Sequence, residues 1–168
     1  VYSQILSALS PSNVSTGDPA FVLTVSGSDF ANGDVVTWGG ADRPTTFFSS
    51  SRLDAAIGSG DLTVGKTVTI AVRNPSGGLS NTIVFTVKNP RPSLSSLTPT
   101  AATGGGTGLT MTLLGSNFVS NTSALWNGES RATTYVSPTE VRASLLAQDL
   151  AAGGDLEVSI GIPAPAGG

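Results

Sequence analysis

Few side chains in this 168-residue chain could carry chemistry, because it contains neither histidine nor cysteine. Their absence excludes a catalytic imidazole, a cysteine nucleophile, thiolate metal ligands and disulfides. Lys66 and Lys88 are the only lysines, and a serine–lysine pair is the one activated nucleophile that the composition allows. Each lysine belongs to the outward-facing polar set of an expected strand. We therefore expect no enzyme activity and no catalytic residues.

Carboxylates could act as paired acid and base, or as ligands of a cation. We expect them in turns or at strand ends, where Asp favours local hydrogen bonds. The residues concerned are Asp29, Asp34, Asp42, Asp54 and Asp61.

The best candidate for a calcium loop is 29–34, with three oxygen-bearing side chains in six residues. Calcium prefers roughly six to eight oxygen ligands, and the similar segment 117–122 has no carboxylate at all. We interpret 29–34 as a turn in which Gly33 supplies an unusual φ and an Asp caps the chain. We expect no metal and no cofactor.

Trp38 and Trp126 offer flat apolar faces of the kind that stack on sugar rings. Each shares strand parity with an apolar residue two positions earlier, Val36 or Ala124, so we interpret both rings as buried core. The remaining aromatic candidates for a contact patch are Tyr2, Phe47, Phe48 and Tyr135.

Arg43 and Arg131 are each followed, after one residue, by Thr-Thr. A guanidinium in such a position could bind the carboxylate of a ligand or a sugar. It could also lie across a sheet and pair with a nearby carboxylate or carbonyl of the protein itself. We favour the structural interpretation.

Charge and hydropathy exclude two kinds of partner. Eight Lys and Arg against eleven Asp and Glu give a net charge of −3, which leaves no basic footprint for nucleic acid. No segment approaches the roughly 20 consecutive apolar residues of a membrane helix. The chain begins with Val1 and has no basic segment before an apolar one, so we expect a mature or trimmed terminus.

The chain is a tandem duplication. Shifting the sequence by 88 positions gives a gapless match from Gln4 on Pro92 to Ser80 on Gly168, with 20 identical residues in 77 pairs. Both tryptophans fall on each other, as do the two arginines discussed above. Prolines at 90 and 92 prevent a strand from running between the copies. We therefore expect two domains, residues 1–89 and 90–168.

Within each copy, apolar residues recur with a period of two, as Phe21, Leu23 and Val25 do. Such short alternating runs, separated by Gly-, Asn- and Pro-rich turns, are typical of a β-sandwich. Only 58–65 and 146–153 could hold a helical turn. In the first copy the pattern predicts strands at 4–8, 20–28, 34–38, 43–49, 52–57, 66–73 and 80–88.

The second copy has no stretch that matches 81–87, the last strand of the first copy. We expect this to leave unpaired peptide groups along the Asp155–Ile162 edge and an uncovered part of the core. Another strand should fill the place. The favoured source is a continuation of the chain with a run like Ser80–Val87, and the alternative is strand addition from a neighbouring subunit. The N-terminus is a poor donor, because its free arm Val1–Ser3 spans only roughly 10 Å.

Several motifs recur in order along both copies. In the first copy they are Leu9-Ser10-Pro11, Gly17, Gly27-Ser28-Asp29-Phe30, Val36-Thr37-Trp38-Gly39-Gly40, the corner Asn74-Pro75-x-Gly77-Gly78 and the closing run 80–87. In the second copy they are Leu97-Thr98-Pro99, Gly115-Ser116-Asn117-Phe118 and Leu125-Trp126-Asn127-Gly128, with Ile162-Pro163-Ala164-Pro165 at the corner.

These motifs resemble IPT/TIG domains, immunoglobulin-like modules of plexins, of some transcription factors and of tandem arrays in bacterial surface proteins. The resemblance implies an all-β fold of two tandem immunoglobulin-like β-sandwiches, the second lacking its last strand. It implies no particular site, because sites are grafted onto such folds.

The composition, with 21 Gly, abundant Ser and Thr and only 11% charged residues, suits a stalk of stacked modules. We expect a non-catalytic structural or adhesive module of an extracellular or bacterial cell-surface protein. It could form a filament by strand addition at the edge described above. The alternative is an accessory carbohydrate-binding module of a secreted glycan-active enzyme. The expected partners are protein, through self-association or neighbouring domains, and surface glycans, without nucleic acid or a membrane span.

Overall fold

The structure is a computed structural model that describes residues 4–151 and 153–165. The chain divides into two compact units, Val1–Lys88 and Asn89–Gly168, which we call the first and the second unit. The regular elements of the described residues are strands and two short 3₁₀ helices, η1 (Ser59–Leu62) and η2 (Ala147–Leu150). The predicted all-β class is confirmed.

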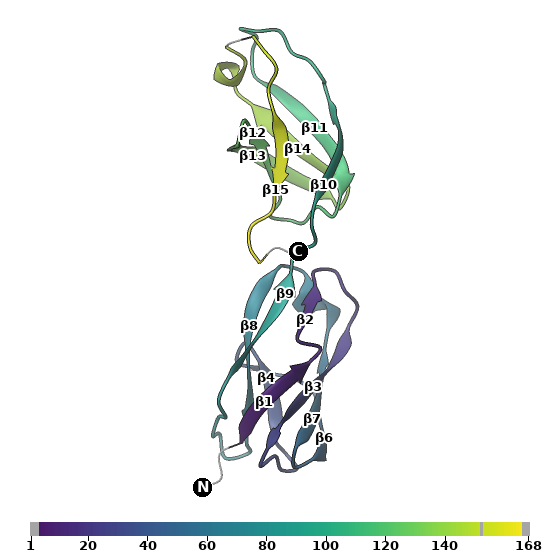
Figure 1. The fold of residues 1–168 in the computed structure, drawn as a ribbon, viewed down its shortest axis with the longest axis vertical. Helices are drawn as coiled ribbons and strands as arrows, with labels where there is room; N and C mark the ends of the chain where they lie inside the picture. The colour runs from purple at the N-terminus through teal and green to yellow at the C-terminus, as the bar shows by residue number, and fades with distance from the viewer. Residues whose placement is uncertain (1–3, 152, 166–168) are drawn as a thin grey trace. The chain divides into compact units, whose positions relative to one another are not determined.

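The first unit is built from two sheets (Figure 1). Neighbouring strands pair antiparallel, except that β2 and β9 pair in parallel. One sheet has the order β1 (Ile5–Ser10), β3 (Phe21–Ser28), β7 (Arg52–Ile57), β6 (Thr45–Ser49). The other has the order β2 (Asn13–Ser15), β9 (Ile83–Lys88), β8 (Lys66–Arg73), β4 (Val35–Trp38), β5 (Ala41–Asp42).

All seven strands predicted for the first unit are present, but β2 and β5 were not predicted. β5 forms a tight hairpin with β4, in which Gly39 and Gly40 adopt φ angles of +58° and +85°. Two consecutive positive φ angles are typical of a two-residue hairpin turn and favour glycine. β2 depends on a long-range pairing with β9, which the local pattern of three residues does not specify.

The second unit repeats this plan with one continuous sheet. Its β13 occupies the places of both β5 and β6. In the first unit Pro44 separates those two strands, because proline lacks the N–H that a continuous ladder needs. The equivalent residue, Ala132, lies inside β13 and pairs with Ser144 of β14. The order is β10 (Ser93–Thr98), β11 (Leu109–Ser116), β14 (Glu140–Leu145), β13 (Glu129–Ser137), β12 (Ser123–Trp126), β15 (Val158–Gly161).

Each unit has its own apolar core. The alternation predicted for β3 is confirmed. Leu23 and Val25 are fully buried, whereas Val22, which precedes Leu23, is 58% exposed. The helices η1 and η2 lie where a helical turn was expected, and each buries one leucine, Leu62 or Leu150. The two cores therefore rest on the same framework and differ where β9 has no counterpart.

Candidate functional site

In the first unit, strand β9 closes the core over Trp38. Phe85 of β9 is fully buried, and its ring centroid lies 5.1 Å from that of Trp38 and 5.9 Å from that of Phe21. Val87 of the same strand is also fully buried. Trp38 is only 4% exposed, which confirms the prediction that it is a core residue.

In the second unit, the equivalent ring borders a cavity. Trp126 is 8% exposed, so its predicted burial is confirmed as well. The cavity has a volume of about 280 Å³ and is lined by Trp126, Leu150 and residues 100–104 and 153–156. Within the described part of the second unit, no other aromatic ring packs on Trp126. This ring therefore lacks the partner that Phe85 provides in the first unit.

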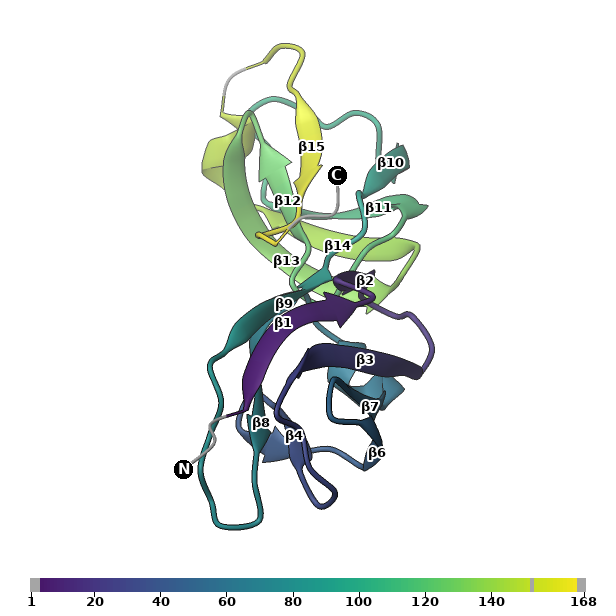
Figure 2. The ribbon, with the colours of Figure 1, turned by 60° about the horizontal axis from the view of Figure 1, so that its bottom comes forward.

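The cavity lies beside a strand that pairs with another strand along one edge only. β15 pairs with β12 as β8 pairs with β4, so that Val158 stands opposite Trp126 as Ile70 stands opposite Trp38. The other edge of β8 pairs with β9. β15, in contrast, is the terminal strand of its sheet in the described structure (Figure 2).

The missing neighbour uncovers part of the second core. Ile70 of β8 is fully buried, whereas the equivalent Val158 is partly exposed. Val68 of β8 is 7% exposed, whereas the equivalent Leu156 is 37% exposed. Both differences are in the direction that the loss of a covering strand requires. The expected uncovered slice of core is confirmed.

The unpaired peptide groups of β15 can be assigned from its hydrogen bonds. The N–H of Asn127 donates to the carbonyl of Glu157 at 2.9 Å. Because peptide groups alternate between the two sides of a strand, positions 157, 159 and 161 face β12. The N–H and C=O groups of Val158 and Ile160 therefore point to the unpaired edge.

This edge is shorter than expected. The predicted strand edge covered 155–162, but only Val158–Gly161 is a strand. Gly154 has a φ of +145°, which takes the chain out of the extended conformation. Glu157 donates its N–H to the side-chain Oδ1 of Asn127 at 2.9 Å, so a side chain ends the ladder there.

The two arginines that the duplication places at equivalent positions each bind the 3₁₀ helix of their own unit. Arg43 donates from Nε and Nη2 to the two carboxylate oxygens of Asp61 at 3.1 and 2.6 Å. Arg131 donates in the same way to Asp149 at 3.0 and 2.7 Å. Bidentate pairs of this kind are the strong form of the arginine–carboxylate bond. The structural interpretation of both arginines is confirmed.

The second of these pairs shifts the pKa values of both its members. The hydrogen bonds from Arg131, and then the one from the backbone N–H of Leu146, hold the pKa of Asp149 below its ordinary value of 3.8. The same pairing raises the pKa of Arg131. Asp149 therefore stays ionised at neutral pH and is engaged within the protein.

The loop 29–34 is a turn held by Asp34, as expected. Asp34 is buried, and its carboxylate accepts the backbone N–H of Ala31 at 2.9 Å and the Nε2 amide of Gln4 at 3.3 Å. Gly33 has a φ of +97°, the conformation that was assigned to it.

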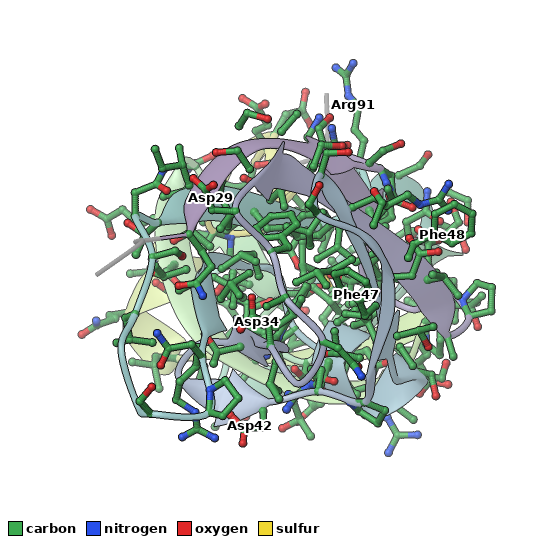
Figure 3. The ribbon with its side chains drawn as sticks, turned by 90° about the horizontal axis from the view of Figure 1, so that it is seen from below. Asp29, Asp34, Asp42, Phe47, Phe48 and Arg91 are labelled. Atoms are coloured by element: carbon green, nitrogen blue, oxygen red, sulfur yellow. The ribbon has the colours of Figure 1, made fainter. Side chains whose placement is uncertain are left out.

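In the second unit a hydroxyl takes over the role of this carboxylate. Thr122 accepts the N–H of Val119 at 2.8 Å. Asp29, Asp34 and Asp42 of the first unit lie apart and do not converge on one point (Figure 3). Among residues 4–151 and 153–165, no group of acidic side chains could hold a metal ion.

One carboxylate was misplaced by the sequence analysis. Asp54 was expected at a turn or strand end, but it lies inside β7. It accepts two hydrogen bonds from Arg52, at 2.9 and 2.8 Å, and one from the hydroxyl of Thr24 at 3.0 Å. Hydrogen bonds from Arg52, with a smaller contribution from Thr24, hold the pKa of Asp54 below its ordinary value. Cross-strand pairing therefore explains an Asp that turn preference does not.

The exposed aromatic candidates are divided between the two units. Phe48 is 67% exposed, and the guanidinium of Arg52 lies 4.6 Å from its ring centre. Phe47 lies on the same strand as Phe48, β6, and is 37% exposed (Figure 3). Tyr135 of the second unit is 36% exposed. Tyr2 lies outside the described residues.

The cavity beside Trp126 is the feature that the sequence analysis missed. The available signal was the aligned pair of tryptophans together with the closing strand present in only one copy. Phe85 has no counterpart in the second copy, so the ring that packs on Trp38 has no equivalent over Trp126.

Comparison with known families gives one match. Residues 92–165 match the model of the IPT/TIG domain. Comparison with curated proteins gives no match. No helix of the described residues has the length and apolar character needed to cross a membrane.

Comparison with solved structures gives matches at low sequence identity. A surface glycan-binding protein from Prevotella bryantii is 14% identical, with a TM-score of 0.50, and the match covers 95% of this chain and 39% of that one. The extracellular region of plexin A4 is 17% identical, with a TM-score of 0.40, over 92% of this chain and 13% of that one. A surface glycan-binding protein of Bacteroides ovatus, solved with a mixed-linkage heptasaccharide, is 20% identical, with a TM-score of 0.37, over 79% and 34%.

The chain thus spans well under half the length of each of these proteins. The likeness to the Prevotella bryantii protein, whose TM-score is 0.50, shows the fold alone. The family match covers nearly all of the second unit, in which Trp126 and the Arg131–Asp149 pair occupy the places of their counterparts in the first. Residues 92–165 of this chain, which make up less than half of its length, are similar to the IPT/TIG domain family.

Proposed function

We propose that this chain is a non-catalytic structural or adhesive module of an extracellular or bacterial cell-surface protein. We further propose that it assembles through β-strand addition at the unpaired edge of β15. The domain family and the low-charge composition rich in Gly, Ser and Thr support the first part. Both arginines considered as ligand-binding residues also have structural partners, Arg43 in Asp61 and Arg131 in Asp149.

The observation that carries the second part is the edge of β15. Exposed edges template the addition of further strands, and natural proteins usually shield them. Here the edge combines the peptide groups of Val158 and Ile160 with a partly exposed apolar side chain, Leu156. Strand addition uses these two features together, since main-chain bonds give affinity and pockets for alternate side chains give specificity.

Sedimentation velocity over a range of concentrations tests this proposal. We expect the parent chain to associate as its concentration rises, and Leu156→Lys to remain monomeric, because a charge on an edge opposes strand pairing. Leu146→Lys is the matched control, since Leu146 is a 55% exposed leucine of the same unit that follows β14, a strand separated from β15 by β13 and β12. A parent chain that stays monomeric at all concentrations contradicts the proposed assembly. So does a Leu156→Lys variant that associates as well as the control.

Glycan binding is the second candidate function. Phe48 supports it as an exposed aromatic ring, and one of the structures with the same fold is a surface glycan-binding protein. Against it, the guanidinium of Arg52 already covers one face of that ring. Retention on insoluble polysaccharides that is lost in Phe48→Ala, with the fold intact by circular dichroism, would favour this function over the structural one.

A further inference from the structure

We propose that the second unit binds a β-strand with the residue pattern of β9, running antiparallel to β15. The pattern is an Asn followed at the second, fourth and sixth positions by an apolar, an aromatic and an apolar residue. The aromatic ring occupies the cavity beside Trp126. This inference rests on the strand addition proposed above and specifies its partner.

The register of the bound strand follows from the duplication. In the first unit β9 pairs with β8, so that Ile83 stands opposite Ile70 and Phe85 opposite Val68. β15 pairs with β12 in the same register in which β8 pairs with β4, with all residue numbers offset by 88. The bound strand therefore places its first apolar residue opposite Val158. Its aromatic residue then stands opposite Leu156.

The cavity has the place and the lining that an aromatic side chain requires. In the first unit Phe85 comes from the position opposite Val68 and packs on Trp38. In the second unit Leu156 and Trp126 stand at the equivalent positions, and both line the cavity. Filling it would restore the ring contact that the first unit has and would cover the exposed part of Leu156.

An asparagine sets the start of the bound strand. Asn81 precedes Ile83 by two residues, and its amide accepts the N–H of Leu6 at 2.7 Å and donates to the carbonyl of Leu6 at 3.0 Å. Leu94 occupies the place of Leu6. It pairs with Gly115 as Leu6 pairs with Gly27, next to a bulge at the same position. An Asn in the bound strand would therefore bind the main chain of Leu94.

Charge selects further among strands of this pattern. Asp155 and Glu157 are exposed beside the cavity and on the approach to β15. Like charges directly opposite each other destabilise a strand pair. The positions of β9 that correspond to their partners are Thr86 and Val84, which are uncharged. The bound strand should be neutral or basic at these positions.

The test uses the full chain and the peptide Asn-Thr-Ile-Val-Phe-Thr-Val-Lys, the sequence of residues 81–88. Amide hydrogen exchange by NMR follows Val158 and Ile160, whose N–H groups face the unpaired edge. We expect saturating peptide to slow their exchange at least tenfold. Ile70 is the internal control, because its edge is already paired with β9 and should not respond.

A second peptide with Ala in place of Phe tests the pattern without altering the protein. Losing the buried ring should weaken binding by roughly ten- to a hundredfold. Equal binding of the two peptides would overturn the aromatic pattern and leave strand addition standing. Absence of protection with either peptide would overturn this inference and strand addition together. Peptide binding by a chain that never self-associates would uphold this inference while contradicting assembly between copies.

Discussion

Replacing Phe85 by Ala should give the first unit the defect that the second unit already has. Phe85 is fully buried between Trp38 and Phe21, with ring centroids 5.1 and 5.9 Å away. Truncating a buried Phe to Ala costs about 3–5 kcal/mol, because transfer and cavity terms add. A small domain has only about 5–15 kcal/mol of stability. The first unit should therefore lose a large part of its margin.

The assay is thermal unfolding followed by tryptophan fluorescence in a Trp126→Phe background, so that Trp38 alone reports. At about 4–8 °C per kcal/mol for a domain of this size, the Tm of the first unit should fall by at least roughly 12 °C. The matched control is Val84→Thr on the same strand, since Val84 is 62% exposed and the β-branched shape is kept. Its effect should stay within about 0.5 kcal/mol. A Phe85→Ala variant that melts within 2 °C of the control, roughly half a kcal/mol, would refute the role assigned to β9.

Further variants test the two tryptophans, a close-packed glycine and the Arg131–Asp149 pair. Trp38→Ala should cost the first unit about 3–5 kcal/mol of stability. Trp126→Ala should cost the second unit less, because the Trp126 ring borders a cavity and lacks a ring partner. Separate urea transitions of the two units would show the difference, and equal losses would contradict it. Gly27→Ala should lower the stability of the first unit by about 1–3 kcal/mol, since a Cβ there would lie 2.0 Å from a main-chain oxygen. Gly60→Ala is the control: its Cβ would meet no atom within 4 Å, so the urea midpoint should stay unchanged. Asp149→Asn should lower the urea midpoint of the second unit at pH 7. Because folding lowers the pKa of Asp149, its contribution is present above the ordinary value of 3.8 and is lost as pH falls through the folded-state pKa. The difference from the parent should therefore shrink toward pH 2, and a constant difference would count against the ion pair.

The strands could be predicted because their apolar period is strict. Phe21, Leu23 and Val25 alternate with residues that face outward, and a half-buried strand leaves that pattern in the sequence. The 88-residue offset then transferred the strand pattern to the second copy. Arg43 and Arg131 were expected to pair with a carboxylate or carbonyl of the protein, but only the structure identifies Asp61 and Asp149 as their partners.

Long-range pairing could not be predicted in the same way. β2 is a strand only because Val14 lies beside Val87 of β9, 73 positions later in the chain. Asp54 was expected in a turn or at a strand end from its residue type, whereas inside β7 its carboxylate accepts hydrogen bonds from Arg52 and Thr24. Local propensity does not contain these cross-strand partners.

The uncovered core of the second unit was predicted, but its form was not. The sequence shows that nothing aligns with Phe85. It does not show that the loop 100–104 and residues 153–156 leave a cavity beside Trp126 where that ring would lie. The size of such a cavity depends on the conformation of the neighbouring loops, and the packing of loops follows no sequence period.

Hydrogen exchange of the chain alone, at a concentration where it is monomeric, tests most directly whether β15 offers an unpaired edge. Ile70 and Val158 stand at equivalent positions. Ile70 directs its N–H away from β4, and Val158 directs its N–H away from β12. The N–H of Ile70 faces β9, whereas that of Val158 faces the unpaired edge. We predict that the amide of Val158 exchanges at least tenfold faster than that of Ile70, after correction for the intrinsic rates of the two residues. Equal protection of the two amides would show that the edge of β15 is already covered and would contradict strand addition.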